Sequence, residues 1–225
     1  TRTIVDPNFG GKVTGKVGRT TLGFLVTDDT SAGKRDDPSD PAFGQNAKVT
    51  IGRARYDLYS ESHIGATFTD REFLDSYSRV AVIDGQFRLG QATRLNFIAA
   101  QSQHRDEDGN ELDGPALGAL LGHTGRNFTA STFFGRTDPD FRTDVGFVRR
   151  VDQQRNLTTI GYRWWPEHWI INWGPTANYQ LNFNHAGIRE DEVMGGGVNF
   201  EFSRNIRASV KADQTLERFG GINFH

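Results

Sequence analysis

The run 106–113, DEDGNELD, gathers the oxygen-bearing side chains that a hard cation prefers. Its alternating acids resemble the first half of a calcium-binding loop, in which successive oxygens wrap the ion. The sixth position, which requires glycine, is Glu111, and the twelfth, which requires an acid, is Leu117. An acidic loop with a turn at Asp108-Gly109 therefore explains the run better, and we expect neither a metal site nor a cofactor.

The six histidines are the natural candidates for acid–base chemistry. His63 and His123 fall near short connections of the chain, whereas His104 and His185 fall near long ones. No Ser-His-Asp or His-x-x-x-His arrangement occurs locally, although separate strands can assemble such sites. The sequence therefore predicts a protein that is not an enzyme.

A second group of charges is interleaved with apolar residues. Asp84 and Arg88 alternate with the apolar positions of 81–89, and Arg207, Lys211 and Asp213 alternate with those of 206–213. Burying these groups unpaired in a dry core would cost several kcal/mol for each ion. We therefore predict that the five charged residues line a water-filled lumen, while the apolar side chains on the opposite face meet hydrocarbon.

The segment 168–185, HWIINWGPTANYQLNFNH, shows how such residues are positioned. Apolar and polar residues alternate almost throughout it, which indicates one long β-strand with an oily face and a wet face. Strands of soluble domains usually have about 5 or 6 residues. A tilted strand that crosses a bilayer needs roughly 9 to 11. The length of this strand thus favours a membrane barrel, with Pro175 marking a bulge near the outer interface.

Composition narrows the class of protein further. The 225 residues show no shift in composition, so we expect a single domain over 1–225. The net charge of -2, from 26 Lys+Arg and 28 Asp+Glu, argues against nucleic acid as a partner. Cysteine is absent, which excludes disulfides. Mean hydropathy is -0.58, and no apolar run approaches the roughly 20 residues of a spanning helix. This does not exclude a barrel, because only every second residue of a barrel strand faces lipid, so the average hydropathy of the strand stays low.

Hydrophobic patterning and turn residues together predict twelve strands. They are expected at 10–18, 21–28, 46–58, 62–70, 77–89, 93–104, 116–125, 127–138, 148–165, 168–185, 191–203 and 206–217. Tight turns alternate with longer polar links at 29–45, 71–76, 105–115, 139–147 and 186–190. Short periplasmic turns and longer outer loops are typical of an outer-membrane barrel, and the 29–45 loop could fold inward as a plug.

Three tryptophans, Trp164, Trp165 and Trp169, surround one expected tight turn at Pro166-Glu167. Aromatic side chains gather where barrel strands leave the hydrocarbon. We therefore predict that these three residues belong to an aromatic girdle at the inner interface.

Three segments together resemble a known family: DPDFRTDVGFVRR at 138–150, GGKVTGKVGRTTLGFLVTDD at 10–29 and SRVAVIDGQFRLG at 78–90. They are similar to the uncharacterised outer-membrane barrel domain that follows a carbohydrate-binding family 9-like module in bacterial envelope proteins. The resemblance implies a secreted precursor and a preceding sugar-binding-like module, but no catalytic residues. That family domain is longer at both ends, and 216–225 reads as a further outer link. We therefore expect this chain to be part of a larger barrel.

The sequence thus predicts an all-β, antiparallel up-and-down transmembrane β-barrel of about twelve strands in the bacterial outer membrane. Its partners would be membrane lipid and a polar solute, with a saccharide suggested by the resemblance alone. The leading function is a channel or an uptake and binding component. The alternatives are an anchor or scaffold for an envelope protein partner, and, less favoured, a soluble β-sandwich or a fibre subunit.

Overall fold

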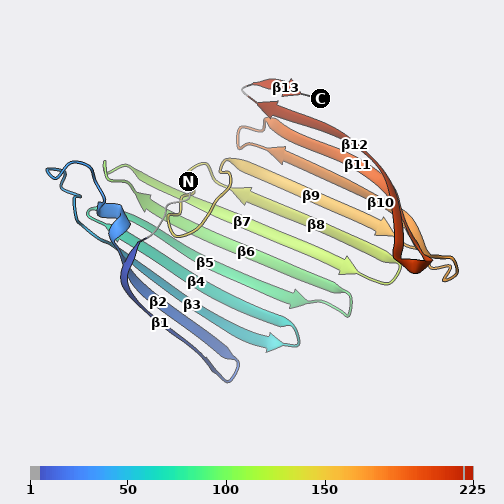
Figure 1. The fold of residues 1–225 in the computed structure, drawn as a ribbon, viewed down its shortest axis with the longest axis horizontal. Helices are drawn as coiled ribbons and strands as arrows, with labels where there is room; N and C mark the ends of the chain where they lie inside the picture. Colours follow the sequence, from blue (N-terminus) through green and yellow to red (C-terminus); the bar gives the residue numbers. More distant parts are fainter. Residues whose placement is uncertain (1–5, 220, 225) are drawn as a thin grey trace. The chain divides into compact units, whose positions relative to one another are not determined.

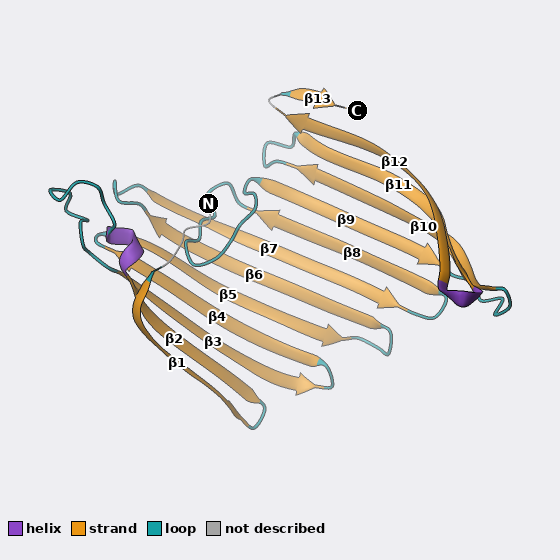
Figure 2. Cartoon of the chain, viewed as in Figure 1, coloured by secondary structure: helices purple, strands orange, loops and turns teal. Residues whose placement is uncertain are grey.

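The computed structural model describes residues 6–219 and 221–224, and strands make up most of this part of the chain (Figures 1 and 2). Two single turns of 3-10 helix, η1 (Thr30–Gly33) and η2 (Ser203–Asn205), are the helical elements among these residues. The strands are β1 (Pro7–Val17), β2 (Thr20–Asp29), β3 (Ala47–Tyr59), β4 (Ser62–Phe73), β5 (Ser76–Arg88), β6 (Thr93–Arg105), β7 (Glu111–Thr124), β8 (Phe128–Thr137), β9 (Gln153–Tyr162), β10 (Ile170–Phe183), β11 (Arg189–Phe202), β12 (Ile206–Phe219) and β13 (Ile222–Phe224).

The order of the strands in the sheet is their order in the chain, from β1 to β13. Each of the twelve predicted strands corresponds to one of β1 to β12. The predicted fold class, all-β with antiparallel up-and-down strands, is therefore confirmed. In the described residues, no helix has the length and apolar character needed to cross a membrane.

The chain divides into two compact units. Unit 1 comprises residues 1–86, 98–117 and 137–151, and unit 2 comprises 87–97, 118–136 and 152–225. In unit 1, β1 to β5 pair antiparallel in sequence, with continuous register from Thr20↔Tyr56 to Asp29↔Ala47 between β2 and β3. In unit 2, β9 to β13 pair in the same way.

The registers of unit 1 sort its side chains onto two faces, because directly paired residues point to the same side of a sheet. One side, the apolar face, carries Val13, Val17, Leu22, Phe24, Val26, Ala54, Tyr56, Ile64, Ala66, Phe68, Ala81 and Ile83. The other, the polar face, carries Lys12, Lys16, Arg53, Arg55, Asp57, Thr67, Arg71, Ser78 and Asp84 among its members.

Unit 2 has the same division. Its apolar face includes Trp173, Pro175, Ala177, Met194, Val198, Phe200, Ala208, Val210 and Ala212. Its polar face includes Thr159, Thr176, Asn178, Asn199, Glu201, Arg207, Ser209, Lys211 and Asp213. Alternation in the sequence is therefore realised as two chemically distinct faces in each unit.

The apolar side chains do not gather into an extensive core. The buried hydrophobic residues of the described chain are Ala42, Ala47, Phe73, Val80, Phe141 and Leu216. By contrast, Val13 on β1 and Val210 on β12 are each 73% exposed, and Trp169 is 69% exposed. A soluble sandwich would bury such side chains between two sheets, and neither unit does so.

Several boundaries differ from the predictions for identifiable reasons. The expected link at 71–76 is a turn of only Leu74 and Asp75, because β4 continues to Phe73 and β5 begins at Ser76. The expected link at 105–115 ends early, since β7 begins at Glu111 and includes Pro115. The connection 163–169 is longer than the predicted tight turn. The alternation of short and long connections is therefore less regular than the sequence suggested.

Two further expectations are wrong in detail. Residues 222–224 form β13 rather than part of a link, while residues 220 and 225 lie outside the described part of the chain. Pro175 pairs regularly with Val198, and the register shifts of β10 lie instead between Ile170 and Asn172 and between Asn182 and Phe183. Proline is tolerated there because pairing between β10 and β9 starts only at Thr176, so the missing N–H lies beyond that ladder.

Candidate functional site

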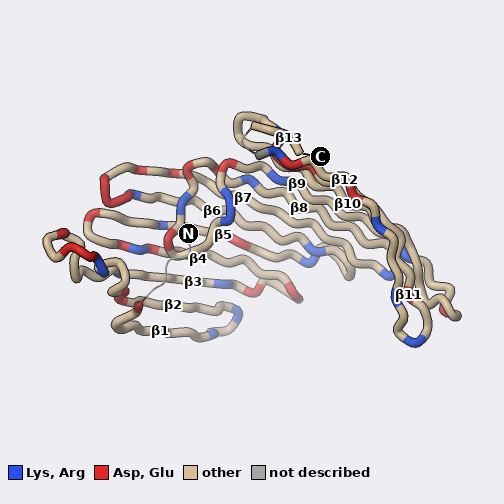
Figure 3. Tube along the Cα trace, turned by 45° about the horizontal axis from the view of Figure 1, so that its top comes forward, with Lys and Arg blue, Asp and Glu red and all other residues tan. Residues whose placement is uncertain are grey.

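Figure 3 marks the charged positions along the strands, and the strand registers place several of those in unit 1 together in a layer on the polar face, toward the short turns. The Arg53 guanidinium on β3 donates two hydrogen bonds to Asp84 on β5, at 2.7 and 2.9 Å, and a third to Thr67 Oγ1 at 2.5 Å. Gly65 lies between them, where a Cβ would come within 2.9 Å of the Arg53 side chain. The predicted lumen residue Asp84 is thus held in a bidentate ion pair.

A second ion pair extends this layer toward the β1–β2 turn. Lys16 Nζ lies 2.7 Å from Asp57 Oδ2, and Arg55 Nε lies 3.1 Å from Asp57 Oδ1. All three side chains share the polar face with Asp84. The sequence pointed to this face through Asp84 and through the alternation of Lys16 with Val13 and Val17, but it did not single out Arg53 or Asp57, although both lie on the polar side of an alternating strand.

Toward the long loops, the polar face becomes apolar. Leu25, Val49 and Ile51 lie side by side there on β2 and β3 and are half-buried. Val80 on β5, which pairs with Thr69, lies on the same face and is buried. Leu25, Val49 and Ile51 line a hollow of about 960 Å³ whose remaining walls include Lys12, Arg71 and residues 144–147. The polar face therefore has two layers of opposite chemistry.

The segment 138–151, which we call the strap, folds against this face of unit 1 at its long-loop end. Its side chain Phe141 is buried, and the Arg142 amide donates to Ser102 Oγ on β6 at 3.1 Å. Ser102 is fully buried and donates in turn to the Gly114 carbonyl on β7 at 3.1 Å. A Cβ on Gly114 would come within 2.6 Å of the Phe141 nitrogen, so glycine is required for this close approach.

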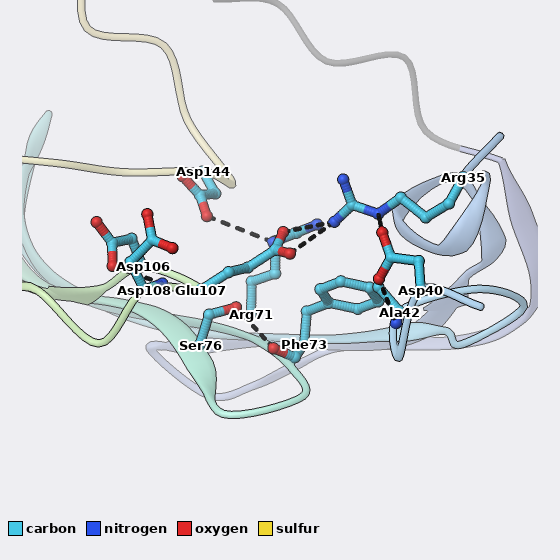
Figure 4. Close-up of polar contacts among 10 residues, drawn as sticks. All are labelled: Arg35, Asp40, Ala42, Arg71, Phe73, Ser76, Asp106, Glu107, Asp108 and Asp144. Carbon is cyan, nitrogen blue, oxygen red and sulfur yellow. Dashed lines mark hydrogen bonds and ion pairs between the residues drawn. The ribbon is translucent and has the colours of Figure 1, made fainter. Parts of the chain in front are cut away.

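Two contacts fix the next part of the strap. The Asp144 amide donates to Ser78 Oγ on β5 at 3.0 Å, and its carboxylate lies 3.4 Å from the Arg71 guanidinium (Figure 4). Ser78 is 1% exposed. Two serine hydroxyls thus accept hydrogen bonds from backbone amides of the strap, and one arginine forms an ion pair with its Asp144 carboxylate.

The 30–46 connection closes over the same end of unit 1. Ala32 and Ala42 pack against Ala47 and Phe73, two buried residues on the polar face. Arg35 donates to both carboxylate oxygens of Glu107 at 2.7 Å and lies 5.8 Å from the Phe73 ring (Figure 4). The strap and two loops therefore cover this part of the face together.

Within the acidic run at 106–113, Asp106 stabilises the loop through hydrogen bonds to its neighbours. Asp106 accepts hydrogen bonds from the Asn110 side chain and from the amides of Asp108 and Asn110, at 2.9 to 3.0 Å. These bonds, led by the one from the Asn110 side chain, lower the pKa of Asp106 below its usual value. Within the described ranges, no three potential ligands converge on a metal position.

The polar face of unit 2 brings three predicted residues onto one strand. Arg207, Lys211 and Asp213 all lie on the polar side of β12, and Arg207 is 3.3 Å from Glu201. Lys211 pairs with Gly197 and Asp213 with Gly195, where the absent Cβ atoms leave room for the charged side chains. Arg88, also in unit 2, donates to the Gly90 carbonyl at 3.2 Å.

Amides and hydroxyls accompany these charges. A hollow of about 530 Å³ on unit 2 is lined by Thr159, Thr176, Asn178, Asn199, Lys211 and Asp213, among others. Both lone-pair acceptors and N–H or O–H donors are therefore available to a polar solute at this position. This face differs from that of unit 1, whose hollow contains several branched aliphatic side chains.

Aromatic residues form a ladder on unit 2, from the end of β9 and the 163–169 connection to the start of β10 and the end of β11. Ring centroids lie 4.9 Å apart for Tyr162–Trp164 and 4.6 Å apart for Trp164–Trp173. The series continues through Phe200 and Phe202 to Trp169, at 5.7 to 6.1 Å per step. Trp165 is not among these stacked rings: its Nε1 donates to the Arg126 carbonyl at 3.0 Å, and the guanidinium of Arg163 lies 5.4 Å from its ring.

One histidine of unit 2 has the partners of a catalytic dyad. His185 Nδ1 lies 2.9 Å from Asp152 Oδ1, but its Nε2 accepts a hydrogen bond from Arg136 at 3.1 Å. A general base needs its second nitrogen for the nucleophile. Here that nitrogen already accepts the hydrogen bond from Arg136, so the His185–Asp152 pair is not arranged as a catalytic dyad.

The two faces define an all-β antiparallel sheet protein whose apolar face is exposed and whose polar face carries ion pairs, amides and hollows. No known protein family matches the chain, and no curated protein matches it either. The resemblance to the barrel domain that follows a family 9-like module therefore stays a prediction. Among solved structures, the chain is similar to one described as the CymD monoaromatic hydrocarbon channel, with 9% identity and a TM-score of 0.35. The similarity covers 93% of this chain and 77% of that chain, and at this level it carries no functional argument.

Proposed function

We propose that the chain forms part of the wall of a bacterial outer-membrane β-barrel and that its polar face lines a lumen that admits or holds small solutes. The observation that carries this proposal is the continuous apolar face of strands 10 to 14 residues long, which remains exposed in both units. Roughly 9 to 11 residues suffice for a tilted strand to cross the hydrocarbon. Lipid is the environment that would cover such a face.

The aromatic ladder supports the same placement. Trp173 lies near the start of β10, and Trp164 and Trp169 lie in the adjoining 163–169 connection, where an interfacial girdle would be found. The sheet order supports it too, because every strand pairs with its chain neighbour, as in up-and-down barrels.

Lipid-dependent quenching tests this placement. In the full-length protein inserted into bilayers, variants keeping a single tryptophan would be compared in ordinary and brominated phosphatidylcholine. A variant keeping Trp169 should lose most of its fluorescence to brominated lipid, because that ring lies in the ladder. A variant keeping Trp165 is the matched control, because its indole N–H is bonded to the Arg126 carbonyl and its ring lies beside two arginines. Equal, weak quenching of both would refute a lipid-facing ladder.

The solute is a separate part of the proposal. The amide and hydroxyl side chains of the unit 2 hollow, including Thr159, Asn178 and Asn199, suit a polar, uncharged molecule such as a saccharide. Planar-bilayer recording with glucose or maltose in the bath tests this assignment. An inserted barrel with no conductance would rule out an open pore, and a current unaffected by either sugar would remove saccharides as the solute.

A scaffold role is the second candidate. The observation in its favour is that the 30–46 connection, residue Glu107 and the strap of unit 1 are held by ion pairs and a buried aromatic rather than left loose. Such an ordered surface could present a binding site to an envelope protein. Copurification of a stoichiometric partner with a non-conducting barrel would favour this role over transport.

A further inference from the structure

The hollow on the polar face of unit 1 is lined largely by aliphatic and aromatic side chains, unlike the amide- and hydroxyl-lined hollow of unit 2. Leu25, Val49 and Ile51 form its floor, and Val145 and Phe147 of the strap contribute to its wall. Burial of an apolar ligand surface against these side chains would therefore be favourable. The hollow of about 960 Å³ is large enough for a small ring or a short chain.

Four charged residues also line this hollow, and three of them already have hydrogen-bond or ion-pair partners within unit 1. Asp29 is 2% exposed and accepts from the amides of Asp6 and Ser31. Arg71 and Asp144 lie within 3.4 Å of each other. The fourth is Lys12, whose side chain makes no hydrogen bond or ion pair with any residue in 6–219 or 221–224.

Lys12 lies in the same cross-strand row as the apolar floor. It pairs with Leu25, which in turn pairs with Ile51. A ligand whose apolar body rests on Leu25 and Ile51 can therefore place one negative group at the Lys12 end of the row. The carboxylates of Asp29 and Asp144 would disfavour a second negative charge in the hollow.

We propose that the hollow between Leu25, Ile51 and Phe147 binds a small amphipathic monocarboxylate, with its apolar body on the aliphatic side chains and its carboxylate on Lys12. The assignment rests on the proposed function, because it requires the polar face to meet solutes in a lumen. It names a ligand class for unit 1 that differs from the uncharged polar solutes assigned to unit 2.

Benzoate is the test probe, and benzyl alcohol is its neutral counterpart. Binding is measured by titration calorimetry on the full-length protein in lipid nanodiscs, alongside single-channel recording of the same preparation. Lys12→Gln should weaken benzoate binding about fivefold and leave benzyl alcohol unchanged, since a contact with an exposed charge contributes up to about 1 kcal/mol. Ile51→Asn should weaken both ligands.

Lys16→Gln is the matched control, because Lys16 lies on the same strand and face but is paired with Asp57 at 2.7 Å. It should leave benzoate affinity unchanged. A barrel that inserts and conducts but does not bind benzoate, or one in which Lys12→Gln and Lys16→Gln have equal effects, overturns the site while leaving the proposed function intact. A chain that does not insert into bilayers overturns both.

Discussion

Replacing Gly114 with alanine should detach the strap from unit 1. The new Cβ would lie 2.6 Å from the Phe141 nitrogen, so the strap must withdraw by about 0.8 Å to reach the 3.4 Å of ordinary contact. This movement weakens the Arg142–Ser102 hydrogen bond and opens the packing of Phe141, which is 5% exposed. One hydrogen bond contributes about 1 kcal/mol, and partial exposure of a phenylalanine costs a similar amount.

A loss of about 2 kcal/mol corresponds to roughly a 30-fold rise in the population of the detached strap. Hydrogen exchange with mass spectrometry, on the peptide covering 138–147, should show this acceleration in the full-length protein. The amides of Arg142 and Asp144 report it directly, because both donate to buried serine hydroxyls. If the polar face lines a lumen as proposed, single-channel conductance should also rise in this variant, because the detached strap would obstruct less of it.

Gly122→Ala provides the control, because Gly122 lies on the same strand and a Cβ there meets nothing within 4 Å. Its exchange profile should match that of the wild type. Unchanged exchange at 138–147 in Gly114→Ala would refute the requirement for glycine. Acceleration spread over all of β7 would show instead that the substitution unfolds the strand.

Three further predictions follow from particular contacts. Arg53→Gln should cost no more than about 1 kcal/mol, because the ion pair is partly exposed, but should shift the reversal potential toward cation selectivity, whereas Arg79→Gln on the apolar face should not. The lowered pKa of Asp106 means that its contribution to loop order is complete above the ordinary value of 3.8 and is lost only as pH falls through the lower folded value. Hydrogen exchange in 106–110, corrected for intrinsic pH effects, should therefore stay slow at pH 4 and rise below it. Gly174→Ala should lower the urea midpoint by the equivalent of roughly 2–4 kcal/mol, since its Cβ would overlap the Tyr162 carbonyl.

Each of these predictions has a clear contrary result. Equal selectivity shifts in Arg53→Gln and Arg79→Gln would mean that the two faces are not chemically separated. Loop exchange that rises already at pH 5 would contradict the lowered pKa of Asp106. A Gly174→Ala protein as stable as Gly15→Ala, where a Cβ meets nothing within 4 Å, would contradict the close approach of β9 and β10.

The strands were predictable because alternation is a local property of the chain. Pairs such as Val13 and Lys12 separate onto opposite faces whatever their neighbours do, so the facing rule needs only the sequence. Strand ends were harder to predict. Pro115 suggested a loop, yet β7 includes it, because its carbonyl accepts the Asp138 amide from the strap at 3.0 Å.

The site was predictable only in part, since its geometry depends on contacts distant in sequence. The strap contacts Ser78, Ser102 and Gly114, which come from three different strands. Small residues at polar-face positions near the long loops are the signal that could have indicated a covering segment. The apolar floor at Leu25 and Ile51 was hard to predict for a related reason: charges near the short turns mark the face as polar, and nothing local in the sequence shows that its chemistry changes toward the long loops.

The order of the strands, in which each pairs with its neighbour in the chain, has a consequence for assembly and for evolutionary growth. Every hairpin can form from residues close in sequence, so the entropic cost of closing each loop stays small and the hairpins can join the growing sheet one after another. Duplication of a hairpin adds two strands without disturbing any existing register. Pore diameter in such a protein can therefore change in steps of one hairpin, while the chemistry of each inherited face is retained.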